Sequence, residues 1–341
     1  VCRAARYSLL GGGKRIRAGK IGNAMIDIAR ENREQTDATQ RVLLAESYFG
    51  LRLAQEVVRV RQDTYNSLKR HYENALKLEA AGMIDKAGRL FAQVNMDEAQ
   101  RSLEASQKEA AVLQNALRTL LNITDTCSIQ PVSPLFINAV LPTKEEFLQT
   151  MQTENYTVNQ LQLQSHIAKQ QLRIEQSGYL PDIVFGKQTL YAHGIQSNLI
   201  PRTMIGVGFT WNLFDGLARE KRIRQSKIAQ QTLSIGQEKA KDDLSVGIDK
   251  LYTQMQKSQD NVRALNTTIE LSEELVRIRK KSFTEGMATS TEVIDSETML
   301  ATVRVARLAA YYEYDVALMN LLALCGTPEE FGKLSNLRVE N

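Results

Sequence analysis

The residues that most often build reactive sites are few in this chain and lie far apart. The three cysteines are Cys2, Cys127 and Cys325. They have neither a Cys-x-x-Cys spacing nor a histidine partner, so the pattern disfavours a metal site. We expect free thiols, with a Cys127–Cys325 disulfide as the alternative in an oxidising compartment. Cys2 has the residue type of a lipidation site, but no apolar leader precedes it.

The histidines and the glycine-rich segment give no stronger indication of catalysis. The histidines are His71, His166 and His193, and none is grouped with a nucleophile. The segment LLGGGKR, from Leu9 to Arg15, resembles a phosphate-binding loop only loosely, because a Ser or Thr after the Lys is missing. We therefore predict no catalytic residue, no cofactor and no bound metal.

Composition and charge exclude further classes of protein. The chain has 341 residues, of which 43% are hydrophobic and 24% charged, with a net charge of +4. Both signs are interspersed, as on solvated helix faces, whereas a nucleic-acid binder gathers its positive charge on one face. The chain has no run of 18 apolar residues, so no membrane-spanning helix is predicted. No signal peptide is visible, and Val1 falls inside what looks like a structural element, so we expect a missing N-terminal segment.

Two long helices are predicted from the places where proline is absent. No proline occurs before Pro131, and none occurs between Pro201 and Pro328. Proline disrupts helix interiors, and both gaps are rich in good helix formers. We expect long helices over 14–78 and 217–283. A helix of about 65 residues spans roughly 100 Å, which favours a coiled-coil architecture.

The second long helix carries a heptad seam. Its members, alternately four and three residues apart, are Leu244, Ile248, Leu251, Met255, Ser258, Val262, Leu265, Ile269, Ser272 and Val276. An a/d pattern of this length predicts helices that pack side by side. Small residues interrupt the seam, which argues against a two-stranded leucine zipper.

The chain is a tandem repeat with a period of 204 residues. Gly12 aligns with Gly216 and Tyr48 with Tyr252, and Gly82-Met83 aligns with Gly286-Met287, without any gap. A gapless register over this distance predicts two copies of one structural unit, each a strand, a long helix, a glycine turn and a shorter returning helix. The expected first repeat is 1–141, with a strand remnant 1–10, the long helix 14–78, a return helix 86–122 and an equatorial segment 123–141. The expected second repeat is 142–341, with a helix 144–178, strands 182–192 and 202–213, the long helix 217–283, a return helix 290–325 and an equatorial tail 326–341.

The second predicted strand has two distinct faces. One face carries Ile205, Val207, Phe209, Trp211 and Leu213. This alternation over about ten residues fits a strand that crosses a bilayer, with those five residues towards lipid. A half-buried hairpin in a soluble sheet fits the alternation as well. Two strands cannot close a barrel, so a membrane role requires several chains to share one.

Three segments together resemble the outer membrane efflux protein family, whose best-known member is TolC. They are WNLFDG (211–216), ENYTVNQLQLQSHIAKQQLRIEQSGYLPDI (154–183) and EGMATSTEVIDSETMLATVRVARLAAYYEYDVALMNLLALCG (285–326). The resemblance implies a mainly α fold with a small β part. Long antiparallel coiled-coil hairpins form an α-barrel, and each chain gives strands to a trimeric 12-stranded β-barrel. It also implies a passive homotrimeric duct for efflux or type I secretion in a Gram-negative outer membrane, mostly periplasmic, which contacts outer-membrane lipid, a periplasmic adaptor and an inner-membrane pump.

The resemblance assigns roles to residues at the glycine turns. Glu292 and Asp295 match the acids that ring the periplasmic aperture, and their spacing of three puts them on one helix face. Alternatively, they are first-turn acids that stabilise a helix N-terminus. The positions of the family's closing contact are Ala288 and Gly88, so we expect the closed state to be held by other residues. The residues expected to meet the adaptor are Gly82, Met83, Gly286, Met287 and Thr289, which also serve as plain bends between helices.

A soluble coiled-coil scaffold is the main competing interpretation. It explains the heptad seam, but it leaves the alternating strand and the paired glycine turns unexplained. The sequence does not distinguish drug, metal and protein export, because one architecture serves all three.

Overall fold

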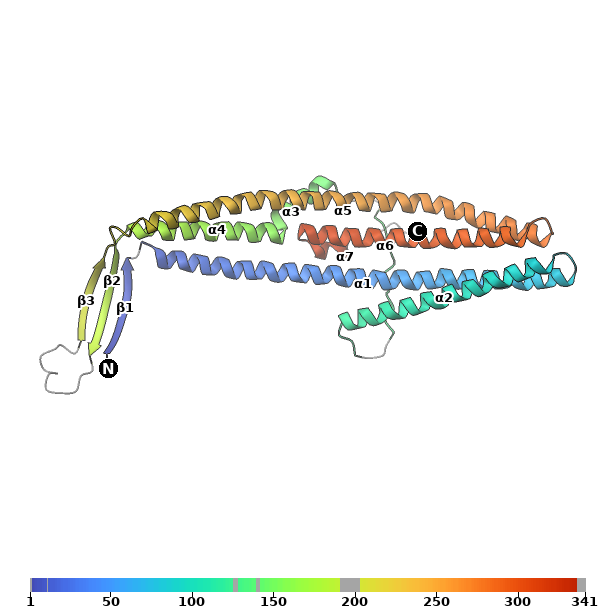
Figure 1. Cartoon of the computed structure of the whole chain (residues 1–341), viewed down its shortest axis with the longest axis horizontal. Coiled ribbons are helices and arrows are strands. Elements are labelled where there is room, and N and C mark those ends of the chain that lie inside the picture. Colours follow the sequence, from blue (N-terminus) through green and yellow to red (C-terminus); the bar gives the residue numbers. More distant parts are fainter. Residues whose placement is uncertain (1, 11, 125–127, 139–141, 191–202, 336–341) are drawn as a thin grey trace. The chain divides into compact units, whose positions relative to one another are not determined.

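The computed structural model describes residues 2–10, 12–124, 128–138, 142–190 and 203–335 (Figure 1). The fold is mainly α with a small β part, as predicted. The elements in chain order are β1 (Cys2–Leu10), α1 (Lys14–Ala80), α2 (Lys86–Leu120), α3 (Lys144–Glu154), α4 (Tyr156–Gln176), the 3-10 turn η1 (Ser177–Tyr179), β2 (Asp182–Leu190), β3 (Thr203–Thr210), α5 (Ala218–Thr284), α6 (Ser290–Cys325), the 3-10 turn η3 (Pro328–Glu330) and α7 (Phe331–Ser335).

The chain forms two compact units. The first comprises Val1–Thr36 and Gln152–Leu244, and the second comprises Asp37–Met151 and Ser245–Asn341. Both long helices contribute residues to each unit. The units therefore cut across the two repeats expected from the sequence, since each unit takes helical segments from both repeats.

The first unit holds an antiparallel sheet of order β1-β2-β3. Val184 pairs with Gly208 and Asp182 with Thr210, where β3 ends. The expected strand 202–213 is therefore too long at its C-terminal end. The next residue, Trp211, falls opposite Pro181, and proline has no N–H to extend the ladder. Residues 191, 192 and 202 of the two expected strands lie outside the described residues.

The expected helix 144–178 is interrupted, which corrects the sequence prediction. α3 ends at Glu154, and Asn155 has an extended backbone with φ −66° and ψ 125°. Its side-chain oxygen accepts a hydrogen bond from the Val158 backbone N–H at 2.9 Å, which caps α4. The return helix expected over 86–122 also ends early, at Leu120, because Asn122 adopts the left-handed conformation with φ 52°.

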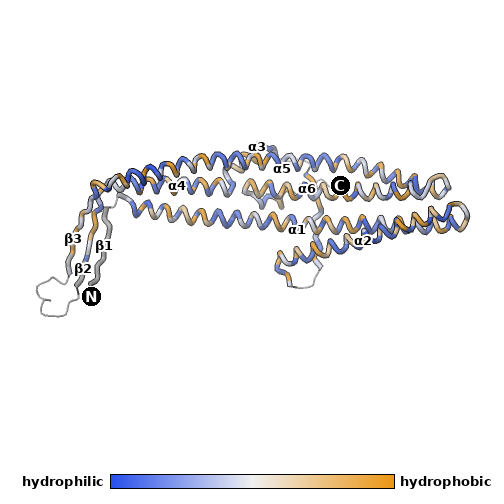
Figure 2. Tube along the Cα trace, viewed as in Figure 1, coloured by the Kyte–Doolittle hydropathy of each residue, from blue (hydrophilic) through white to orange (hydrophobic). Residues whose placement is uncertain are grey.

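The second unit buries the heptad seam. Ile248, Met255 and Val262 on α5 are completely buried. Val262 packs with Ala310 and Tyr311 of α6, and further along the same two helices Ile269 and Val276 pack with Leu300. Hydrophobic and hydrophilic residues alternate along every long helix (Figure 2), as helices with narrow apolar seams require.

An extended segment over 128–138 packs across the helices of the second unit. Phe136 contacts the rings of Phe49, Tyr314 and Phe331, with centroid separations of 6.4, 6.3 and 5.8 Å. The Tyr48 hydroxyl accepts a hydrogen bond from the Val132 backbone N–H at 2.8 Å. Residues 125–127 and 139–141 of the expected equatorial segment, and 336–341 of the expected tail, lie outside the described residues. Cys325 is a buried free thiol, while Cys127 falls in that undescribed part.

Candidate functional site at the turns of the two helical hairpins

The two glycine turns have the same backbone geometry. Gly82 and Gly286 adopt the left-handed conformation, with φ 72° and 74°. In the first turn, the Gly82 N–H donates to the Glu79 carbonyl (2.9 Å) and the Met83 N–H to the Leu78 carbonyl (2.9 Å). Gly286 and Met287 repeat this pattern with 3.1 and 2.8 Å. This pair of bonds ends a helix when a residue without a Cβ follows it, which explains the Gly-Met pair in both repeats.

Each turn is followed at once by a capped helix. In the second turn, Thr289 and Glu292 form a reciprocal capping box, with bonds of 3.3 Å to Thr289 Oγ1 and 3.2 Å to Glu292 Oε2. Glu292 also forms an ion pair with Arg279 at 3.4 Å. Asp295 is exposed. The capping alternative is therefore observed for Glu292, while the aperture ring of Glu292 and Asp295 stays a prediction about an assembly of several chains.

Residues of both turns line a cavity whose wall is mainly apolar. Met83 and Met287 are 55% and 72% exposed, and the Met83 methyl group lies 3.8 Å from where a Cβ on Gly286 would stand. The cavity has a volume of about 510 Å³, and Phe91 and Ala288 line it. Gly82, Met83, Gly286, Met287 and Thr289 are thus brought to one end of the second unit. Their contact with an adaptor stays a prediction.

The positions of the family's closing contact serve other roles in this chain. Ala288 packs against a buried apolar cluster that contains Ala75, Phe283 and Val293. The Gly88 N–H donates to Asp85 Oδ1 at 2.8 Å, which caps α2. Neither residue supplies a charged contact between the hairpins.

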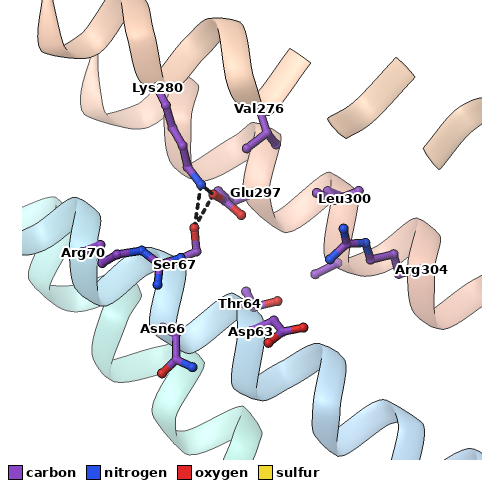
Figure 3. Close-up of a pocket in the computed structure, with 11 residues that line it drawn as sticks. Asp63, Thr64, Asn66, Ser67, Arg70, Val276, Lys280, Glu297, Leu300 and Arg304 are labelled. Carbon is purple, nitrogen blue, oxygen red and sulfur yellow. Dashed lines mark hydrogen bonds and ion pairs between the residues drawn. The ribbon is translucent and has the colours of Figure 1, made fainter. Parts of the chain in front are cut away.

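Five polar residues near the turns, which we call the clasp, join the two hairpins. They are Ser67 and His71 on α1, Lys280 on α5, and Ser290 and Glu297 on α6. Lys280 Nζ donates to Ser67 Oγ at 2.7 Å, Ser67 Oγ donates to Glu297 Oε1, and Lys280 forms an ion pair with Glu297. Figure 3 shows these three side chains converging from three helices. Next to them, His71 Nε2 lies 2.7 Å from Ser290 Oγ.

Burial determines the electrostatics of the clasp. The Glu297 side chain is 7% exposed, whereas that of Lys280 is 41% exposed beside a polar cavity of about 280 Å³. Arg70 and Arg304 also line this cavity. Burial of the imidazole lowers the pKa of His71 to about 4, against an opposing effect of Glu297 and with a smaller contribution from Lys280. The clasp therefore holds one ion pair that is buried on the Glu297 side only, and one neutral imidazole.

Sequence reasoning missed the clasp, although a signal for it was present. Leu68, His71 and Ala75 are three and four residues apart, which is seam spacing on α1. A histidine at a seam position must find a polar partner on the facing helix, because burial of an unsatisfied imidazole is costly. The sequence does not identify that partner, Ser290, which lies 219 positions away.

The predicted lipid-facing residues lie at one end of the first unit. Ile205, Val207 and Phe209 of β3 are between 63% and 69% exposed. Trp211 and Leu213 lie beyond the strand end, and both are exposed. Trp211 Nε1 donates to the Tyr179 carbonyl at 3.1 Å. Among the described helices, none combines the length and apolar character needed to cross a membrane. The described ranges also contain no group of three His, Cys, Asp or Glu residues suited to hold a metal ion.

Solved structures share this fold at low sequence identity. CusC matches with a TM-score of 0.82 and 16% identity over 96% of this chain and 77% of that chain. VceC from Vibrio cholerae, an outer membrane protein, matches with a TM-score of 0.78 and 17% identity over 96% and 79%. The open state of the MtrE outer membrane channel from Neisseria gonorrhoeae gives 0.78 and 16% over 96% and 80%. No curated protein sequence matches the chain.

A sequence model of a protein family identifies the family of this chain. The outer membrane efflux protein model matches residues 147–327, which is more than half of the chain. The match covers the second glycine turn and the whole of β3, α5 and α6. The chain therefore belongs to the outer membrane efflux protein family, a family of outer-membrane channels and not of enzymes.

Proposed function

We propose that this chain is one protomer of a trimeric outer-membrane duct that carries substrates passively from the periplasm to the outside. The duct works with a periplasmic adaptor and an inner-membrane pump, in a tripartite efflux or type I secretion system. The apolar face of β3 is the observation that carries the proposal. Three large apolar side chains lie on this face, and each is more than 60% exposed in the single chain. An apolar patch of this kind is expected to be buried against lipid or another protein.

Lipid is the cover that fits this face. The alternating residues give one apolar side to the strand, and the three strands described here leave open sheet edges. Open edges are not stable in hydrocarbon, so a membrane location requires strands from other chains to close a barrel. Family membership supports the same assembly. A soluble coiled-coil scaffold accounts for neither the family match nor the exposed strand face.

The assembly is tested by light scattering on the full-length protein extracted in detergent, with the 341-residue chain measured beside it. We expect the full-length form to have the protein mass of three chains, and to be recovered only in detergent. A detergent-free monomer or dimer of the full-length form would contradict the duct and restore the scaffold.

The lipid face is tested through Trp211, which is the only tryptophan of this chain. In vesicles that contain brominated lipid, we expect its emission to be quenched, because bromine quenches on contact. A Trp211→Phe, Phe209→Trp double variant puts the indole on the apolar face within β3 and should also be quenched, whereas a Trp211→Phe, Thr210→Trp double variant puts it on the opposite face at nearly the same depth and should be quenched less. Equal quenching at both positions would contradict the assigned face.

A further inference from the structure

The clasp connects the two helical hairpins, which no backbone segment joins near their turns. α1 belongs to the first hairpin, which turns at Gly82, whereas α5 and α6 form the second hairpin, which turns at Gly286. Ser67 and His71 are four residues apart and so share one face of α1. Ser67 contacts Glu297 and Lys280, and His71 contacts Ser290. Every polar contact of the clasp from α1 therefore reaches the other hairpin.

The imidazole of His71 occupies a closed site. Its side chain is 5% exposed, and its ring lies 4.5 Å from the ring of Phe283, between centroids. The charged groups that act on the ring are Glu297 on α6 and Lys280 on α5. From α2, Ala92 packs with Ala75 and Phe283 in the apolar cluster, one helical turn from His71.

A proton on His71 would conflict with this site in two ways. The imidazolium would be buried next to an aromatic ring with little water to solvate it, and it would add a second cation near Lys280. Glu297 offsets this cost only in part, because Lys280 and Ser67 already contact its Oε1 atom. Separation of α1 from α6 would expose the imidazolium to water and relieve both costs.

We propose that the clasp is an acid-sensitive tie between the two hairpins, which weakens when His71 takes up a proton. Its release removes the polar part of the contact between the hairpins and leaves the apolar cluster of Ala75, Phe283 and Val293 to hold the two turns together. The tie goes beyond the passive duct proposed above, because it makes the contact between the hairpins depend on the pH around the turns. It depends only on contacts within one chain, so it stands or falls separately from the trimer.

The direction and size of the response follow from linkage. The pKa of His71 is lowered in the clasp to about 4, from 6.5 for an exposed histidine. The clasp is therefore at full strength above pH 6.5 and weakens as the pH falls towards 4. Between pH 7.5 and pH 5, the equilibrium constant for the closed clasp is expected to fall roughly 30-fold.

Backbone hydrogen exchange on the full-length protein in detergent, followed by mass spectrometry, tests this tie. After correction for the intrinsic effect of pH, peptides over 64–75 and 288–299 should lose roughly 30-fold in protection between pH 7.5 and pH 5. His71→Gln keeps a group able to bond Ser290 but does not titrate, so its protection should stay constant. His166→Gln is the matched control, because His166 is exposed on α4 and should leave the loss unchanged.

The exchange results have definite readings. A wild-type protein with no loss of protection, or a His71→Gln variant with the wild-type loss, would overturn the proposal. Exchange at the C2 carbon of histidine provides a second test that needs no variant, because it reports the pKa of each imidazole in the wild-type protein. We expect His71 to titrate below pH 5. Titration near 6.5, as for an exposed histidine, would also overturn the proposal. Light scattering on the same samples keeps this outcome separate from the duct proposal.

Discussion

Removing either member of the clasp's ion pair should destabilise the protein, but by different amounts. Glu297 is almost fully buried, whereas Lys280 borders a cavity and keeps much of its surface in water. Glu297→Gln frees an ammonium group that can turn towards solvent. Lys280→Met instead leaves a buried carboxylate whose strongest partner is gone. The two substitutions remove the same ion pair, but they should not cost the same free energy.

The expected magnitudes follow from burial. Glu297→Gln keeps the acceptor for Ser67 and should lower the free energy of unfolding by about 1 kcal/mol, the net value of one typical hydrogen bond. Lys280→Met should lower it by about 3 kcal/mol, the lower end for breaking a buried pair, because Ser67 still donates to Glu297. The double variant should lose about 2 kcal/mol less than the two single variants together, which is the coupling energy of the pair.

Urea denaturation of the full-length protein, followed by circular dichroism at one protein concentration, measures these values. The pair Glu274–Arg277 is a matched control, since both side chains are more than half exposed on α5 and their separation is 2.6 Å. Its double-mutant cycle should show no measurable coupling, because water and salt screen exposed pairs. Equal losses for Glu297→Gln and Lys280→Met, or a clasp coupling no larger than that of the control, would refute the reasoning.

Three further predictions concern the turns and the core. Gly82→Ala should lower the free energy of unfolding by about 1–2 kcal/mol from left-handed backbone strain alone, since no atom lies near the new Cβ. Gly22→Ala inside α1 should instead raise the free energy of unfolding by about 0.5–1 kcal/mol. Thermal unfolding measures the sign of both changes. Glu292→Gln with Asp295→Asn keeps the capping box but removes charge, so single-channel recordings should show weaker cation selectivity, and unchanged selectivity would leave only the capping role. Leu321→Ala should cost about 2–5 kcal/mol in urea denaturation, because Leu321 is completely buried, and a loss under 1 kcal/mol would contradict its place in the core.

The sequence predicts the helices well because their signals are local and repeated. The bounds expected for the last return helix, 290–325, agree with α6, since Thr289 caps its start and Gly326 ends it in a left-handed conformation. The predicted strand 202–213 is too long, because the end of β3 depends on Pro181, which directly precedes the neighbouring strand. Periodicity within one segment carries no information about the residues that pair with it.

The candidate site was predicted only in part for the same reason. The turns at Gly82 and Gly286 follow from the repeat alone. The clasp does not, because it pairs residues of the two hairpins that are not equivalent under the 204-residue shift. His71 at a seam position indicated a buried polar contact. The identity of that contact depends on how α1 and α6 pack, which no local pattern specifies.

The equal lengths of α1 and α5 restrict how this molecule can change size. Each has 67 residues, and the turns that follow them line one shared cavity. Removal of one heptad from a single hairpin would carry its turn about 10 Å away from the other, at 1.5 Å per residue. Removal of one heptad from α1, α2, α5 and α6 together would preserve both the seams and the shared cavity. Shorter or longer versions of this architecture should therefore arise through matched changes of seven residues in all four helices.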